Sequence, residues 1–216
     1  MRLQAALALA LCASPIGTAA AQGVGGFGQT FNVERRIYYR GSVFQQTGLW
    51  FGAAGAVRLG PVQVGLSGLM GTVTGGGSVS PDVQIRTTAV TFHYLIAPWI
   101  ALGVQAEARR FDSDAGTTMW RLIGVNARLD PGLGVAGLRG IADLSVLPAS
   151  SVSGGPSLAM AVQATAGVAW APGGGLVDLR LSYRFERYDI ASAASTAARY
   201  EQYRGVNAGV GIQLGR

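Results

Sequence analysis

The segment LVDLRLSYRFERYD, residues 176–189, alternates between apolar and charged side chains with a period of two. Its odd-numbered positions are mostly apolar, as at Leu181, whereas its even-numbered positions include Asp178 and Arg180. Successive side chains of a β-strand point to opposite faces, so this pattern predicts a strand with one apolar and one charged face. A soluble sheet would turn the charged face to water, and a membrane barrel would turn it toward its lumen.

The same period runs through most of the chain. Counted back from the C-terminus, it predicts strands at 199–215, 176–189, 157–170, 133–147, 118–129, 100–111, 83–96, 62–74 and 47–59. Bacterial barrels built from one chain have even strand numbers, so we expect a tenth strand at 29–39, with Phe31 and Val33 on its apolar face. An eight-stranded barrel is the alternative if this first hairpin lies outside the barrel.

The length of the segments and of their connections also favours a barrel. The segments reach a dozen residues or more, beyond the usual five or six of a globular strand. Short turn sequences at 59–61, 97–99, 130–132 and 171–175 alternate with longer polar stretches at 75–82, 112–117, 149–156 and 191–198. This alternation is typical of a barrel with tight turns at one end and loops at the other.

Aromatic residues indicate which solvent surrounds the barrel. The residues predicted to form two interfacial belts are Trp50, Trp99, Trp120, Trp170, Tyr183 and Phe185, around strand centres that are largely aliphatic. Two aromatic belts match the two interfaces of a bilayer. A soluble sandwich is the alternative, since aromatics are common in any strand. Charged residues make up only 13% of the chain, which favours an all-β, up-and-down transmembrane barrel over a soluble domain.

The first residues have the features of a secretory signal peptide. Met1 and Arg2 precede an apolar run, and the small residues Ala19 to Ala21 predict cleavage before Gln22. We therefore expect a signal peptide over 1–21, a flexible segment over 22–28 and the barrel over 29–216. A lipoprotein acylated at Cys12 is the alternative. Cleavage after Ala21 would remove the only cysteine and leave no possibility of a disulfide.

The polar faces predict a charge network that fills the lumen. Its expected members are Glu34, Arg36, Arg58, Glu107, Arg109, Arg128, Arg139, Asp143, Asp178, Arg180, Arg184, Glu186 and Glu201. An arginine facing lipid at the bilayer midplane costs about 2 to 4 kcal/mol, and small barrels have interiors that side chains can fill. Five other arginines lie at strand positions whose side chains would face lipid: Arg35, Arg86, Arg121, Arg187 and Arg204. Apart from Arg35, these are expected near the outer strand ends, where they could meet anionic lipid.

No convergent catalytic, metal or cofactor site is evident. His93 is the only histidine, and its strand position places it far from Asp112 and Asp114, so a histidine and aspartate site would be split. Two carboxylates also fall short of a calcium loop. The formal charge is +6, but the arginines are scattered, which argues against nucleic acid. We expect no enzyme activity, metal, cofactor or nucleic-acid partner.

In pattern, the whole mature chain resembles the small outer-membrane β-barrel proteins of Gram-negative bacteria. Asn207, Gly209, Ile212 and Leu214 fit the polar-x-Gly-x-x-hydrophobic-x-hydrophobic signal that the barrel assembly machinery reads on a last strand, although the chain continues to Arg216. The resemblance implies an outer-membrane location, a periplasmic C-terminus, contact with outer-membrane lipids including lipopolysaccharide, and a monomer.

Two functions are compatible with this pattern. The first is a non-enzymatic structural or surface-interaction role for a barrel with a largely filled, charged lumen. The alternative is a narrow channel that prefers anions, because small inward-facing residues such as Gly103 and Gly124 could leave a path beside the arginines.

Overall fold

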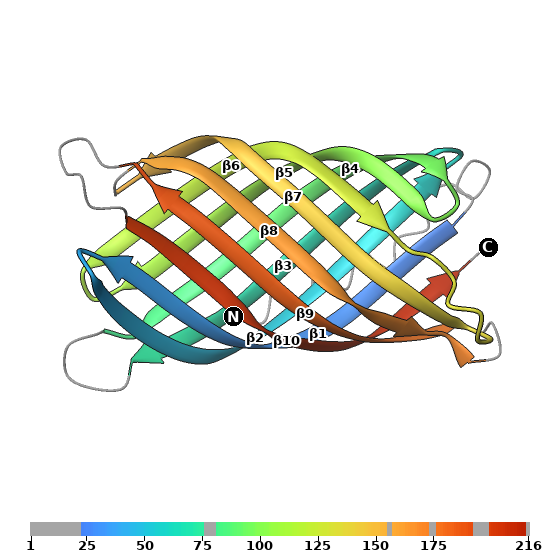
Figure 1. Ribbon diagram of the computed structural model, residues 1–216, viewed down its shortest axis with the longest axis horizontal. Coiled ribbons are helices and arrows are strands. Elements are labelled where there is room, and N and C mark those ends of the chain that lie inside the picture. Colours follow the sequence, from blue (N-terminus) through green and yellow to red (C-terminus); the bar gives the residue numbers. More distant parts are fainter. Residues whose placement is uncertain (1–22, 76–80, 155–156, 173–175, 192–198, 215–216) are drawn as a thin grey trace.

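The computed structural model describes residues 23–75, 81–154, 157–172, 176–191 and 199–214, and the predicted signal peptide lies outside them. The described residues form ten strands: β1 (Gly23–Tyr39), β2 (Ser42–Leu59), β3 (Val62–Gly75), β4 (Val83–Ala97), β5 (Ile100–Ser113), β6 (Gly116–Leu129), β7 (Leu138–Ser153), β8 (Leu158–Trp170), β9 (Val177–Ile190) and β10 (Arg199–Leu214). Each pairs antiparallel with its sequence neighbours, and β1 pairs with β10 to close the barrel (Figure 1). The all-β barrel of ten strands, rather than eight, is confirmed.

The two ends of the barrel are distinguished by the chain itself. The terminal end is where β1 begins and β10 ends, at the right of Figure 1, and the distal end carries the hairpin between β1 and β2. That hairpin is a two-residue turn in which Arg40 and Gly41 both have positive φ angles, 50° and 80°. Such turns match the twist of antiparallel strands.

The start of the barrel differs from the prediction. Residues 23–28, expected to be a flexible segment, form the first part of β1, where Val24 lies opposite both Leu214 of β10 and Val57 of β2. The physical reason is that backbone hydrogen bonds to two neighbouring strands hold a glycine-rich segment that has little side-chain pattern of its own.

The connections also depart from strict alternation of short and long. The stretch 112–117, expected to be a long loop, is mostly strand, with only a two-residue turn between β5 and β6. Conversely, residues 133–137, expected to begin a strand, belong to the connection between β6 and β7 at the terminal end. Polar sequence therefore does not distinguish a strand that projects beyond an apolar band from a loop.

The outer surface is apolar around the middle of the barrel. Its exposed side chains include Leu66, Val104, Ile123, Leu181 and Val206, one from each of five strands. Trp99 and Trp170 are also exposed, at the terminal end. An aliphatic band next to aromatic side chains is the surface of a transmembrane β-barrel.

None of the described segments contains a helix with the length and apolar character needed to cross a bilayer.

The predicted faces of β1 are wrong. Phe31, Val33 and Arg35 point into the lumen, whereas Glu34 and Arg36 lie on the outer face. The physical reason is that the distal part of the lumen is packed with apolar side chains, so the rule that the apolar face meets lipid fails there. On the outside, Glu34 instead forms an ion pair with Arg204 of β10 at 2.9 Å.

Candidate functional site

The lumen has two parts: the distal half is packed with side chains, and the terminal half contains a cavity. The distal half is a packed core, which we call the distal plug: Phe31, Val33, Arg35, Trp50, Val73, Ile85, Arg109, Phe111, Trp120, Leu122, Leu147, Tyr188 and Tyr203. The terminal half holds a cavity of about 910 Å³, the terminal cavity, and a smaller cavity of about 260 Å³ lies toward the middle. Arg128 and Arg180 line both cavities.

A series of aromatic rings crosses the distal plug. The successive ring contacts are Phe31 to Trp50 at 5.6 Å, Trp50 to Tyr203 at 5.6 Å, Tyr203 to Tyr188 at 5.8 Å, Tyr188 to Trp120 at 5.0 Å and Trp120 to Phe111 at 4.4 Å. These rings come from β1, β2, β10, β9, β6 and β5. Edge and tilted contacts at these distances are favourable beyond their buried area, so the rings connect opposite walls of the barrel.

Arg109 lies at the centre of the plug and has no exposed surface. Its guanidinium carbon is 4.7 Å from the ring centroid of Tyr188 and 5.2 Å from that of Tyr203. Its Nη1 lies 2.7 Å from Glu186 and its Nη2 lies 3.2 Å from Glu107. A buried charge is tolerated only when partners surround it, and here two carboxylates and the faces of aromatic rings do so.

The charges of the plug balance one another. Glu186 also forms an ion pair with Arg184 and accepts a hydrogen bond from the Tyr188 hydroxyl at 3.0 Å. A second group nearby joins Arg35 to Glu201 at 2.7 Å. Three arginines therefore face three glutamates, and the distal half of the lumen is close to neutral.

A chain of hydrogen bonds connects the plug to the terminal cavity. Gln163 donates to Glu107 at 2.7 Å, Gln105 to Gln163 at 3.0 Å, Ser145 to Gln105 at 2.8 Å and Asn126 to Ser145 at 2.8 Å, and Asn126 is also hydrogen-bonded to His93. These side chains come from β8, β5, β7, β6 and β4. Because each polar group has a partner, the network holds five strands in register across the lumen.

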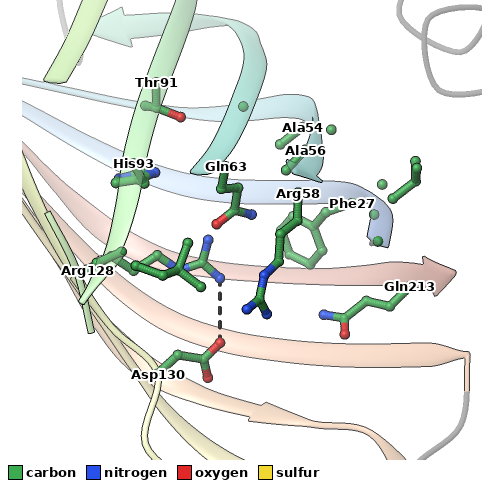
Figure 2. Close-up of a pocket in the computed structure, with 18 of the residues that line it drawn as sticks. Phe27, Ala54, Ala56, Arg58, Gln63, Thr91, His93, Arg128, Asp130 and Gln213 are labelled. Atoms are coloured by element: carbon green, nitrogen blue, oxygen red, sulfur yellow. Dashed lines mark ion pairs between the residues drawn. The ribbon is translucent and has the colours of Figure 1, made fainter. Parts of the chain in front are cut away.

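The terminal cavity is lined by cations. Four arginines contribute to its wall, Arg58, Arg128, Arg139 and Arg180, together with His93 and Asp130. Figure 2 shows Arg58, Arg128, His93 and Asp130 around the cavity. Asp130 is shared by Arg128, at 3.5 Å, and Arg139. Asp178 is shared by Arg139, at 2.9 Å, and Arg180, at 2.8 Å. The arginines outnumber these carboxylates, so the cavity is electropositive.

Most of the predicted lumen network lies inside the barrel. The inward-facing members are Arg58, Glu107, Arg109, Arg128, Arg139, Asp143, Asp178, Arg180, Arg184, Glu186 and Glu201. Glu34 and Arg36 are the exceptions, on the outer face of β1. Arg35, which was assigned to the lipid face, takes their place in the lumen.

The predicted aromatic belts are partly wrong. Trp99, Trp170 and Tyr183 are exposed, and Phe185 is half-buried on the outer face. Trp50 and Trp120, in contrast, are buried in the distal plug. The reason is parity: Trp50 shares its face of β2 with Arg58, and Trp120 shares its face of β6 with Arg128. The shared face of each tryptophan with a lumen arginine can be read from the sequence, and it would have placed both tryptophans in the lumen.

Two inward glycines that suggested free space lie at close approaches between strands. A Cβ atom on Gly103 would lie 1.9 Å from the carbonyl oxygen of Phe92 on the next strand, and one on Gly124 would lie 2.0 Å from that of Val146. Only glycine fits these close approaches, which let long strands coil into a narrow barrel.

The candidate catalytic groups remain apart. His93 is buried in the lumen against Asn126, whereas Asp112 lies at the distal rim, where it accepts a hydrogen bond from Arg110 at 2.8 Å. Among the described residues, no group of three histidine, cysteine, aspartate or glutamate side chains is placed to hold a metal.

Comparison with solved structures identifies the fold. No family profile and no curated protein matches the sequence. The outer-membrane protease OmpT from Escherichia coli is similar, with a TM-score of 0.60 and 8% identity over 92% of this chain and 99% of that chain. The Neisserial surface protein NspA also matches, with a TM-score of 0.39 and 14% identity over 87% of this chain and 96% of that chain. The chain is a closed β-barrel of the outer-membrane type.

The plug predicts an unequal response to two similar substitutions in β9. Glu186→Gln should lower the free energy of unfolding by about 3 to 5 kcal/mol, because the fully buried Arg109 and the half-buried Arg184 lose the carboxylate that they share. Asp189→Asn breaks an ion pair with Arg187 on the outer face, where solvent screens it, and should cost about 0 to 1 kcal/mol. Urea unfolding in lipid vesicles, followed by tryptophan fluorescence, measures both. Equal losses would contradict the role assigned to the buried network.

Proposed function

We propose that this chain is a non-enzymatic, integral protein of the bacterial outer membrane with a closed lumen and a structural or surface-interaction role. The observation that carries the proposal is the distal plug: Arg109 of β5 is fully buried, and its guanidinium lies against aromatic rings of β2, β9 and β10 on the opposite wall. A solute that crossed the barrel would have to displace this arginine and its ion pairs.

The location and orientation are supported by the surface. The apolar outer band requires a lipid environment, and Ile212 and Leu214 of the last strand are exposed there, where assembly machinery can read them. The terminal end would then face the periplasm, with the distal hairpins outside. Closure of β1 onto β10 leaves no open sheet edge, which supports a monomer.

The absence of enzyme activity is supported by the separation of the candidate groups. His93 lines the terminal cavity, and Asp112 faces outward at the distal end. A substrate could not contact both side chains at once.

A narrow, anion-preferring channel is the second candidate. It is favoured by the arginine lining of the terminal cavity, which is the kind of wall that attracts anions. This function requires the distal plug to open.

Liposome swelling separates the two functions. The unmodified protein should admit no small solute, and neither should Leu49→Ala/Phe51→Ala, which shortens two outward side chains of β2. Phe31→Ala/Trp50→Ala removes an edge-to-face pair from one side of the plug and should permit uptake, because it leaves a gap along that wall beside Arg109. Charge-selective uptake by the unmodified protein would overturn the closed lumen and favour the channel.

We further propose that anionic lipid, such as the phosphates of lipopolysaccharide, contacts an outward arginine patch at the distal rim. The patch consists of Arg86 of β4, Arg110 of β5 and Arg121 of β6. Arg86 lies directly opposite Arg110 in the ladder, a like-charge arrangement that is unfavourable without an anion. Of the three, Arg110 is paired with a carboxylate, that of Asp112 at 2.8 Å. The patch therefore carries excess positive charge.

Loss of this charge should reduce lipid binding. Arg86→Gln/Arg110→Gln/Arg121→Gln should lower the lipopolysaccharide that co-purifies with each barrel, measured as phosphate per protein. The matched control is Arg187→Gln/Arg204→Gln, because those arginines are already paired with Asp189 and Glu34. An equal decrease in both variants, or no decrease in the triple variant, would contradict the lipid contact.

A further inference from the structure

The terminal cavity is a cup rather than part of a continuous pore. The distal plug closes it on one side, and on the other it extends to residues at the terminal end of the barrel, among them Gly23, Pro98 and Gln213. Its volume of about 910 Å³ is within the range of pockets that bind small molecules. We propose that this cup binds a small organic anion that carries a carboxylate or phosphate group and an apolar part.

The charge of the cup favours an anionic ligand. Asp130 and Asp178 between them neutralise part of the charge of Arg128, Arg139 and Arg180. Arg58 has no carboxylate within ion-pair distance among the described residues, and its Nε donates to the carbonyl of Gly60 in its own turn at 3.1 Å. Arg58, Arg128, Arg139 and Arg180 line the cup, whereas Asp130, Asp178 and, in the adjoining smaller cavity, Asp143 supply three carboxylates. The excess positive charge therefore lies at Arg58, near the open terminal end, where an anion can reach it.

The geometry provides donors that converge. Figure 2 shows the guanidinium groups of Arg58, from β2, and Arg128, from β6, extending into the cavity, with the amide of Gln63 beside them. Guanidinium groups offer paired N–H donors that match the oxygens of a carboxylate or phosphate. An oxyanion between Arg58 and Arg128 would also relieve the repulsion of two cations that share one cavity.

The remaining wall accounts for the apolar part of the ligand. Phe27, Leu95 and Ile100 line the same space, and Phe27 is held against the guanidinium of Arg180 at 4.5 Å. Ala54 and Ala56 contribute small side chains on the wall next to Arg58. An inorganic ion would leave this apolar surface uncovered, so the lining fits an organic anion better than an inorganic one.

This site goes beyond the closed-barrel function. Binding in the cup needs access only from the terminal end, so it does not depend on whether the plug ever opens or on the lipid patch outside.

Binding can be measured by ¹⁹F NMR line broadening on the full barrel in detergent. The probes are 4-fluorobenzoate, 4-fluorophenyl phosphate and the cation 4-fluorobenzylammonium. Both anions should bind and the cation should not, and the two anions distinguish carboxylate from phosphate recognition. Arg58→Gln and Arg128→Gln should each weaken anion binding roughly ten- to hundred-fold, the usual effect of losing a charged hydrogen bond.

Arg58→Gln leaves no carboxylate unpaired, so it should fold even if Arg128→Gln does not. Arg187→Gln, on the outer face, is the control and should bind the anions as the unmodified protein does. Cation binding as tight as anion binding, or anion binding that Arg58→Gln leaves unchanged in a folded barrel, would overturn the proposal.

Discussion

The packing of the lumen depends on one buried cation. Arg109 is held between Glu107 and Glu186 and beneath the rings of Tyr188 and Tyr203. An isolated charge at this depth would be prohibitively costly, whereas one that is ion-paired to two carboxylates favours a fixed arrangement of the groups around it. The aromatic rings pack on the guanidinium, and the polar side chains of β5 and β8 are ordered by Glu107. Closure of the distal lumen is therefore as much electrostatic as steric.

The terminal half differs from the distal half in the size of its inward side chains. Large rings at Trp50, Phe31 and Trp120 fill the distal lumen, but at the terminal end the inward positions of β2 carry Ala54 and Ala56. With no bulky side chains there, arginines line a cavity and do not close it. The partners proposed for the two ends differ accordingly: lipid at the distal rim, and a diffusible anion at the terminal cup.

Much of this arrangement follows from the sequence. The period of two places Asp178, Arg180 and Glu186 on the inner face of β9, and the even strand number required of a closed barrel predicts β1. These features follow from geometry that every strand of a barrel obeys. The faces of β1 did not follow, because Phe31 and Arg35 share one face. Hydropathy alone does not reveal that part of the lumen is apolar.

Other features depend on contacts between distant segments. The ion pairs Arg109 with Glu186 and Arg35 with Glu201 join strands that are far apart in the chain, and no local pattern specifies such partners. The division of the lumen likewise depends on which rings meet across it. Inward glycines such as Gly103 suggested free space but instead mark close strand approach.

Cysteine accessibility tests the closed distal lumen and open terminal cup most directly. The only cysteine of the chain, Cys12, lies in the predicted signal peptide, so single cysteines can be introduced at Gln63, in the terminal cavity, and at Ala161, buried beside the plug. With a small, charged methanethiosulfonate reagent and the folded barrel in detergent, Gln63→Cys should react rapidly, whereas Ala161→Cys should react only after unfolding. Equal rates at the two positions in the folded barrel would contradict a lumen that is open at one end and closed at the other.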